Sequence, residues 1–480
     1  MLKYVKFLSV IFFSIILIWT CERKTNPALP NSPPNTTLAN IPKENDTLFA
    51  LLTLHWDGED YDGFISAYQY RYVTYHLFMG DSVVQEWETT QETSVTIPFE
   101  SSDELNYQRF EVRAVDDLGE IDPEPAQRTF YTVQTVFPET EILIPEDEEQ
   151  FFVIDHVTDW WQGVPLTFQA TDADGEVVEY AWRVDDGEWN WTEDTTLTIE
   201  PQYFDPLDGP HIISVISRDN TNLIDPVGDS ITVNLVQPSF TKDILIVDET
   251  DESLFSSFPA LQSDTLVDGF YARVFGNNDE WDFRANGMPP KDVLGEYRLI
   301  IWHADNPYSN PTNVHKLPQH IEDVKDYLNV GGNLIMGGWR ILKSFAQAEP
   351  FPKSFEPGTF IHDYLHIKQA DETNAYDFVG CNPFSSVTDT FYVDKNKVNV
   401  FPFYGKLDKI NIMPQRAGFT EVMYVYANYI TDLPFWRGEP VGIRYYGTSF
   451  NTIVLGFPLF LIREDDAKIM ANDMLRSLGF

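Results

Sequence analysis

Two motifs recur in the same order along this chain, and this duplication restricts the possible folds more than any other feature of the sequence. Residues 60–71 (DYDGFISAYQYR) and 172–183 (DADGEVVEYAWR) share a D-x-D-G stretch followed at identical spacing by Tyr and Arg. Residues 112–123 (VRAVDDLGEIDP) and 215–226 (VISRDNTNLIDP) share a second pattern. Two patterns repeated in one order predict a duplicated module of about 100 residues.

Each module is predicted to be an all-β sandwich. Short β-branched and aromatic runs follow each D-x-D-G stretch, and Gly, Asp and Pro turns interrupt them. The modules, at 41–136 and 137–240, resemble the fibronectin type III and immunoglobulin-like modules of bacterial surface proteins. The pattern W-x-G-x-D-x-D-G at 56–63 carries this resemblance, and the second module lacks its Trp. The resemblance implies a fold and leaves the activity open.

The repeated aspartates allow two interpretations. Carboxylate oxygens gathered at one end of a sandwich would suit Ca²⁺, whereas Asp and Gly also form turns in which the Asp side chain accepts from its own backbone. We favour the turns, with calcium as the alternative and no other cofactor. No EF-hand pattern is present, since no Glu stands at its twelfth position. The candidate calcium ligands are Asp60, Asp62, Asp116, Asp172, Asp174 and Asp219.

The first 20 residues are predicted to be a signal peptide. Two lysines precede an apolar run at 7–19, which is shorter than the roughly 20 residues needed to span a bilayer core. The run ends at Cys21 in a stretch that resembles a lipobox, which implies lipidation of Cys21 and cleavage before it. An uncleaved N-terminal anchor is the alternative. Residues 21–40, rich in Pro, Asn, Ser and Thr, are predicted to be a tether.

A different pattern begins at 241 and continues to 480. Apolar runs at 243–247 (DILIV), 298–302 (RLIIW) and 333–336 (NLIM) alternate with amphipathic helical periods. Strands that are apolar throughout are typical of parallel sheets covered by helices on both faces. The sequence therefore predicts two all-β sandwiches followed by an α/β domain with a three-layer parallel sheet.

The stretch from LIIW to GGNLIMGG resembles class I glutamine amidotransferase-like domains, which have a flavodoxin-like fold. Active members of that superfamily place a nucleophilic Cys on the sharp turn after a strand, with a His as base. In this chain Gly337, Gly338 and Trp339 follow the strand at 333–336, so the resemblance implies a domain that lacks the nucleophile. The other cysteine, Cys381, is a weaker alternative nucleophile.

Candidate ligand residues follow the predicted parallel strands. Asp248 ends the first strand, and His303 and Asp305 follow the second, at the edge where open α/β sheets bind ligands. Trp339 is a further candidate, as a stacking face for a sugar or aromatic group. His362 and His366 stand four residues apart, which on a helix would suit a metal, although packing is the favoured interpretation.

The net charge of the chain limits the classes of partner that it can bind. Asp and Glu total 75 against 32 Lys and Arg, a net charge of −43 that opposes binding to nucleic acid. We predict an envelope lipoprotein, at the outer membrane or cell surface, that binds or assembles with an unknown carbohydrate or protein ligand without catalysis. The alternative is a surface hydrolase acting on carbohydrate or peptide. A purely structural spacer is the third interpretation.

Overall fold

The computed structural model describes most of the chain after residue 29. The predicted signal peptide and Cys21 lie outside the described residues, as does Asp174. The chain divides into two compact units, one of Met1–Thr140, Ala170–Glu179 and Ile216–Val227, and one of Glu141–Gln169, Tyr180–Val215 and Gly228–Phe480. The described residues are 30–39, 43–77, 80–99, 106–133, 136–153, 161–173, 175–220, 222–251, 263–305, 315–386, 389–399 and 403–480.

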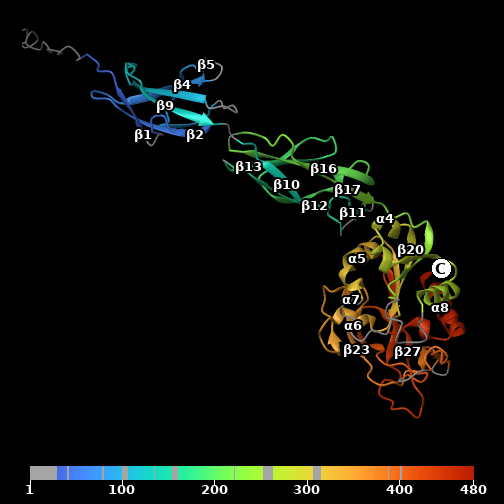
Figure 1. The fold of residues 1–480 in the computed structure, drawn as a ribbon. Helices are drawn as coiled ribbons and strands as arrows, with labels where there is room; N and C mark the ends of the chain where they lie inside the picture. Colours follow the sequence, from blue (N-terminus) through green and yellow to red (C-terminus); the bar gives the residue numbers. More distant parts are fainter. Residues whose placement is uncertain are drawn as a thin grey trace, which may run out of the picture. The chain divides into compact units, whose positions relative to one another are not determined.

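The first module is a β-sandwich of two sheets, with strand orders β1-β3-β7 and β2-β9-β8-β4-β5, and with β6 paired to β4 (Figure 1). Alternate residues of β3 and β8 point inward, so Leu54, Trp56, Phe110 and Val112 are buried together with Phe130. The strands are β1 (Asn35–Ala39), β2 (Thr47–Phe49), β3 (Leu51–Glu59), β4 (Ile65–His76), β5 (Asp81–Val84), β6 (Glu88–Thr90), β7 (Ser94–Pro98), β8 (Asn106–Asp116) and β9 (Ala126–Val133).

The second module repeats this plan, with strand orders β10-β12-β15 and β11-β17-β16-β13-β14. In each module a short strand pairs in parallel with the last strand: β2 with β9 in the first, and β11 with β17 in the second. The duplication predicted from the two motifs is therefore present in the strand pairing. The elements are β10 (Glu139–Ile144), β11 (Glu149–Phe152), β12 (Val164–Thr171), β13 (Val177–Val184), β14 (Asn190–Thr192), β15 (Thr196–Ile199), η1 (Pro201–Tyr203), β16 (Gly209–Asp219) and β17 (Asp229–Val236).

The predicted tether is too long at its C-terminal end. Asn35–Ala39 forms strand β1 and pairs antiparallel with β3, so the first sandwich begins inside the segment predicted as 21–40. The backbone N–H of Thr36 donates to Asp122 at 2.7 Å, and the Thr36 hydroxyl accepts from the N–H of Ala114 at 2.8 Å. These long-range bonds outweigh the local composition, which by itself indicates an irregular segment.

The C-terminal domain, hereafter the head, contains a nine-stranded sheet of order β19-β18-β20-β21-β29-β28-β27-β24-β25. The first five strands in this order pair in parallel, as the apolar runs predict. The strands are β18 (Lys242–Asp248), β19 (Asp279–Asp282), β20 (Tyr297–Ala304), β21 (Asn333–Gly338), β24 (Gly380–Pro383), β25 (Phe391–Tyr392), β27 (Thr420–Ala427), β28 (Pro440–Tyr446) and β29 (Asn451–Leu455).

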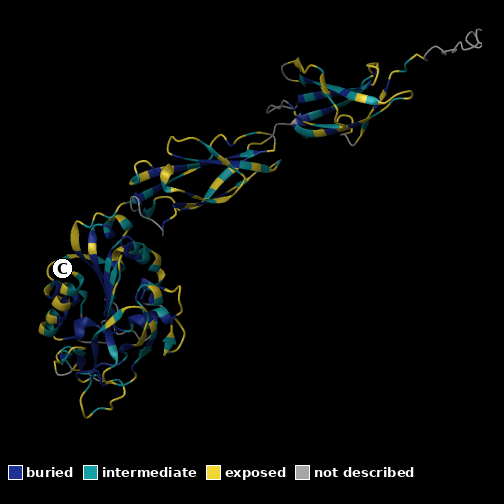
Figure 2. Cartoon of the chain, turned by 180° about the vertical axis from the view of Figure 1, so that it is seen from behind, coloured by how far each residue is buried: buried dark blue, intermediate teal, exposed yellow. Residues whose placement is uncertain are grey.

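Both faces of the parallel part are buried (Figure 2). On β18, Ile244 and Ile246 face the core that α2 and α8 cover, while Leu245 and Val247 face the core that α5, α6 and α7 cover. Figure 1 shows α8 on the opposite side of the sheet from α5, α6 and α7. The other elements are α2 (Asp264–Phe275), α3 (Phe283–Asn286), α4 (Lys291–Leu294), η4 (Leu317–Gln319), α5 (Ile321–Asn329), α6 (Ile341–Ala346), β22 (Lys353–Ser354), α7 (Phe360–Asp363), β23 (Ile367–Glu372), β26 (Asn411–Arg416), η5 (Leu459–Leu461) and α8 (Glu464–Leu478).

The prediction of a wholly parallel sheet is wrong for the second half of the head. Strands β28, β27, β24 and β25 are antiparallel to their neighbours, and β22, β23 and β26 form a separate small antiparallel sheet. The chain between β28 and β29 is residues 447–450, which is too short for a parallel crossover and requires a hairpin.

Across the residues that the structure describes, no helix is both long and apolar enough to cross a membrane.

Candidate functional site

The C-terminal ends of the parallel strands lie in register at one edge of the head sheet. Asp248 on β18 stands beside Asp282 on β19 and beside His303 on β20. His303 in turn stands beside Gly337 on β21. Because parallel strands end at the same edge, two of the ligand residues predicted from the sequence, Asp248 and His303, are brought together.

His303 is held on two sides. Its Nδ1 lies 3.2 Å from Oδ1 of Asp248, and its ring stacks on Tyr271 of α2 with centroids 3.7 Å apart. Burial lowers the pKa of His303, against the attraction of Asp248, so the imidazole is neutral at pH 7. The carboxylate favours the proton on Nδ1, which leaves a lone pair on Nε2, and no described residue forms a hydrogen bond with this buried atom.

Asp305, the third predicted ligand residue, lies in the same buried group. Its side chain is completely buried, and Oδ2 accepts from the Tyr271 hydroxyl at 2.9 Å. Burial raises the pKa of Asp305 to about 7, although the bonds from Tyr271 and from the Phe460 N–H oppose this. Oδ1 is buried without a partner among the described residues. A raised pKa of this kind is typical of functional groups.

Two further acids, Asp268 and Glu280, complete this edge. One carboxylate oxygen from each of Asp248, Asp268 and Glu280 lies within 4.8 Å of the others. Burial raises the pKa of Asp268 to about 7, helped by the negative charges of Glu280, Asp248 and Asp282. Burial and the same kind of repulsion raise the pKa of Glu280. Three oxygens at this spacing could hold a divalent cation, which would relieve the repulsion.

The turn after β21 has the geometry of a nucleophile elbow with an arginine in it. The strand ends at Gly338, and α6 begins at Ile341. Between them Arg340 has φ 63° and ψ 24°, a left-handed conformation that costs a non-glycine residue about 1–3 kcal/mol. In α/β hydrolases the strained residue between a strand and a helix carries the nucleophile. The sequence predicted that the strand ends at 336, whereas β21 continues through Gly337 and Gly338.

Arg340 is fixed by an ion pair. Its Nε and Nη2 donate to the two carboxylate oxygens of Glu372 on β23, at 2.8 and 3.1 Å. Both side chains are nearly buried, and Lys409 lies 3.7 Å from the same carboxylate. A bidentate guanidinium pair is geometrically specific. An arginine side chain cannot attack a carbonyl as a nucleophile. Here Arg340 links the turn after β21 to β23 through Glu372.

Trp339 is not available as a stacking face. The structure buries its ring in the core, where the indole N–H donates to the carbonyl of Asp408 at 3.0 Å and the ring lies against Phe403. The prediction of Trp339 as a ligand residue is therefore corrected. Gly338 beside it is required by close approach, because an added Cβ would lie 2.4 Å from the carbonyl oxygen of Ala304.

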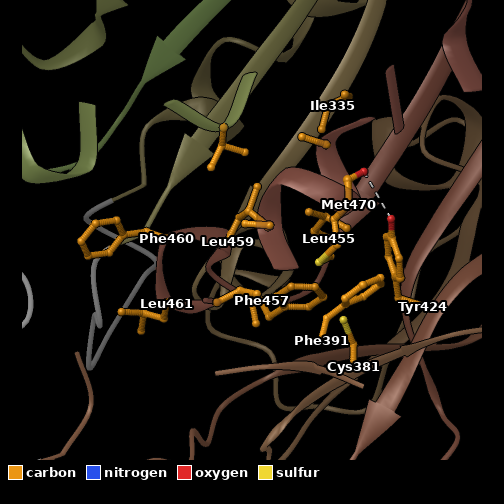
Figure 3. Close-up of a cluster of buried hydrophobic side chains, with 14 of the residues drawn as sticks. Ile335, Cys381, Phe391, Tyr424, Leu455, Phe457, Leu459, Phe460, Leu461 and Met470 are labelled. Atoms are coloured by element: carbon orange, nitrogen blue, oxygen red, sulfur yellow. Dashed lines mark hydrogen bonds between the residues drawn. The ribbon is translucent and has the colours of Figure 1, made fainter. Parts of the chain in front are cut away.

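Cys381 lies in the hydrophobic core, with Phe391 and Tyr424 around it (Figure 3). Its side chain is completely buried, and burial raises the pKa of the thiol well above its usual range. A thiol in such surroundings is inert. His362 and His366 do not share a helix, because α7 ends at Asp363, and His366 lies against the ring of Tyr445.

The aspartates of the two sandwiches accept hydrogen bonds from the backbone. Asp116 accepts from the N–H groups of Leu118 and Glu120 at 2.9 and 2.8 Å, and Asp219 accepts from that of Leu223 at 2.8 Å. The pKa of Asp116 is lowered: burial opposes this shift, but the bonds from Asn31 and the backbone outweigh it.

The D-x-D-G stretches form turns of the same kind. Asp60 accepts from the N–H of Asp62 at 3.3 Å, and Asp62 from that of Ser32 at 3.2 Å. In both copies an added Cβ on the glycine would lie 2.5 Å from the first aspartate, Asp60 or Asp172. Among the described residues of the sandwiches, no three acids bring ligand atoms within 4.8 Å of one another. Calcium binding there stays a prediction.

No family model and no curated protein matches the chain. Solved structures similar to it include β-sandwich modules of the fibronectin type III, immunoglobulin-like and PKD kinds. The fibronectin(III)-like modules of Clostridium thermocellum CbhA share 17% identity over 42% of this chain and 95% of that one, with a TM-score of 0.21. The PKD1 domain of Vibrio anguillarum Epp shares 16% over 21% and 99%, with a TM-score of 0.15. A bacterial ice-binding adhesin shares 10% over 46% and 73%, with a TM-score of 0.19. At these TM-scores the likenesses carry no inference about function.

Proposed function

We propose that this chain is a lipid-anchored envelope protein, at the outer membrane or cell surface, whose β-sandwiches carry a head that binds a ligand without catalysis. The observation that carries the proposal is Arg340. The left-handed position between β21 and α6 holds an arginine that is ion-paired with Glu372, where a hydrolytic head requires a nucleophile. This fits the amidotransferase-like fold that the sequence resembles, in a form without the nucleophile.

In this proposal the ligand reaches the edge through the partly buried Asp268 and the exposed Glu280, because Asp248, His303 and Asp305 are buried. Carboxylates with raised pKa values repel one another, and a cation or a cationic group on a larger ligand relieves that repulsion. The ligand is therefore a cation-bearing surface carbohydrate or protein, or a divalent cation. The net charge of −43 disfavours nucleic acid.

Turnover assays on the purified chain test the absence of catalysis. We expect no ammonia from glutamine and no hydrolysis of peptide or glycan substrates, because no nucleophile occupies the elbow. Ammonia release that disappears in Cys381→Ser would contradict the proposal and make Cys381 the nucleophile.

A surface hydrolase is the second candidate, and His303 is the observation that favours it. A histidine with Asp248 near Nδ1 and an unpartnered Nε2 has the arrangement of a general base. Two substitutions on β18 separate the hydrolase from the binding protein. Asp248→Asn changes the acid beside His303, and Asp243→Asn changes an exposed acid near the start of the strand and is the control. Turnover that survives Asp243→Asn and is lost in Asp248→Asn would establish the hydrolase.

A further inference from the structure

The loop at residues 428–439, between β27 and β28, exposes large apolar side chains. Ile430 is 93% exposed, Leu433 79% and Phe435 76%. Single exposed apolar residues are ordinary, but three on one short loop form a patch, and such patches mark interaction surfaces. This apolar patch contrasts with the strongly acidic character of the chain, whose net charge is −43. The 428–439 loop is separate from the edge with Asp248, and the inference drawn from it does not depend on the proposed function.

Polar groups behind the patch hold the loop in shape. Arg437 donates from Nε to Oδ1 of Asn428 at 2.7 Å and from Nη2 to the carbonyl of Tyr429 at 2.7 Å. Lys406 donates to Asp432, the one acid between Tyr429 and Arg437, at 2.9 Å. The apolar side chains are therefore exposed on a fixed frame, which lowers the entropy cost of binding.

Several backbone carbonyl groups of the loop accept hydrogen bonds from within it. Those of Tyr429, Leu433 and Pro434 accept from Arg437 or Asn428, and that of Trp436 accepts from Glu439. The Asp432 N–H donates to the Tyr429 carbonyl at 2.9 Å. A protein partner would offer hydrogen bonds to such groups, so their internal pairing is not needed for a protein interface. Hydrocarbon offers none, so the internal pairing of these carbonyl groups favours a lipid contact.

Side chains of the kind found at bilayer interfaces accompany the apolar residues of this loop. Tyr429 is about one-third exposed, and the ammonium groups of Lys395 and Lys406 lie 5.8 and 5.1 Å from its ring centre. Trp436 is partly buried against the head core. Aromatic rings and cations concentrate at the headgroup level of membranes, with aliphatic and phenyl groups deeper.

We propose that the 428–439 loop inserts into the surface of a lipid bilayer, with Ile430, Leu433 and Phe435 among the acyl chains. Lys395 and Arg437 lie at the headgroups, where anionic lipids complement their charge. Lys406 neutralises Asp432, the one acid between Tyr429 and Arg437. The head thus contacts a membrane directly, in addition to any attachment through Cys21.

Vesicle co-sedimentation tests the proposal. The chain is prepared without residues 1–21, none of which is among the described residues, so that no acyl chain contributes. The probe is vesicles of phosphatidylethanolamine with a minor share of phosphatidylglycerol. We expect the chain to sediment with the vesicles, and Leu433→Ser and Phe435→Ser each to lower the partition coefficient about tenfold or more.

Phe419→Ser is the matched control, because Phe419 is 91% exposed at the other end of β27. It should leave partitioning unchanged, and thermal melting should show all three variants folded, since each substitution is at an exposed side chain. The proposal is overturned if the parent chain stays in solution, if Phe419→Ser lowers partitioning equally, or if only protein-containing membranes bind it. The last result would assign the loop to a protein partner.

Discussion

Two buried aspartates, Asp116 in the first sandwich and Asp305 in the head, have pKa shifts in opposite directions. In the first sandwich Asp116 is buried and accepts two backbone hydrogen bonds, and its pKa is lowered. In the head Asp305 is also buried, Oδ1 has no partner among the described residues, and its pKa is raised to about 7. Burial is the largest cause of this raised pKa, and the two donors, the Tyr271 hydroxyl and the Phe460 N–H, do not offset it. Enough donors turn a buried aspartate into a structural element, whereas too few leave a group that can exchange a proton or bind a cation.

The largest expected effect is an opposite pH dependence of stability in the two regions. The folded head keeps the proton of Asp305 up to about pH 7, whereas the unfolded chain releases it near pH 4. Between these values the folded state binds more protons, so the free energy of unfolding falls as pH rises, by about 4 kcal/mol from Asp305 alone. Asp116, whose folded pKa is lowered, contributes stability at neutral pH that is lost on acidification.

Cys381 provides a reporter for the head, because its thiol is completely buried in the folded state. Labelling of this thiol in increasing urea should give a higher midpoint at pH 5 than at pH 8. Asp305→Asn should flatten the dependence, since the amide oxygen still accepts from Tyr271 but cannot ionise. A midpoint that rises with pH, or a dependence that Asp305→Asn leaves unchanged, would mean that Asp305 is ionised in the folded head.

The second effect concerns aspartates that accept two backbone bonds. Asp122 accepts from Thr36 and Glu124 at 2.7 and 2.9 Å, and Asp225 in the second sandwich accepts from Thr140 and Val227 at 2.9 and 3.0 Å. Replacing either with Ala leaves two N–H groups without their charged acceptor. We expect each substitution to lower the free energy of unfolding by about 3 kcal/mol, measured by urea denaturation.

The control for this prediction is Asp122→Asn, which keeps one acceptor oxygen and should cost less than Asp122→Ala. Labelling of Cys381 should be unchanged in both variants, because Asp122 lies in the first sandwich. A loss smaller than about 1 kcal/mol for Asp122→Ala would mean that water replaces the carboxylate, and the structural account of these aspartates would fail.

The fold was predictable where the pattern is local or repeated. The two motifs located both sandwiches, and the apolar runs located β18, β20 and β21, because strands buried on both faces leave a continuous apolar signature. Strand β1 was missed, since the bonds of Thr36 to Asp122 and Ala114 join positions far apart in sequence. The antiparallel half of the head was missed because its strands alternate less regularly.

The site was only partly predictable. Asp248 and His303 end strands, so chain position alone places them at one edge. Asp268 lies on a helix and Glu280 on a short edge strand, and nothing in their local sequence shows that they converge on Asp248. The one available signal was the spacing of Asp264 and Asp268, which puts two acids on one face of a helix. Arg340 was missed because its left-handed conformation is a property of the backbone and not of the residue type.

A smaller effect is expected from divalent cations at the head edge. Mn²⁺ held by Asp248, Asp268 and Glu280 would stabilise the folded head by roughly 2.7 kcal/mol at one hundred times the dissociation constant. The stabilisation should be stronger at pH 8 than at pH 5, because protons compete for the same carboxylates. Calorimetric titration measures the binding directly. Asp268→Asn should abolish it, while Asp243→Asn, at the start of β18, should not; equal binding in both would place the cation elsewhere.

The smallest effect on stability is expected from Ca²⁺ binding to the sandwiches. The hydrogen bonds of the sandwich aspartates predict no specific calcium site among the described residues. Oδ1 of Asp116, Asp219 and Asp60 and both oxygens of Asp62 accept backbone hydrogen bonds, and a cation bound to these atoms would have to displace those donors. Oδ2 of Asp60 has no hydrogen-bond partner among the described residues. Ca²⁺ and Mg²⁺ should therefore raise the melting temperature of the sandwiches equally and slightly, by screening the net negative charge. A larger effect of Ca²⁺ than of Mg²⁺ would reverse this conclusion, since Ca²⁺ tolerates irregular oxygen cages that Mg²⁺ does not. If the additional effect of Ca²⁺ vanished in Asp60→Asn but not in Asp243→Asn, the D-x-D-G turns would be calcium sites. The sandwiches and the head would then both bind cations and would differ only in the number of ligand oxygens at each site.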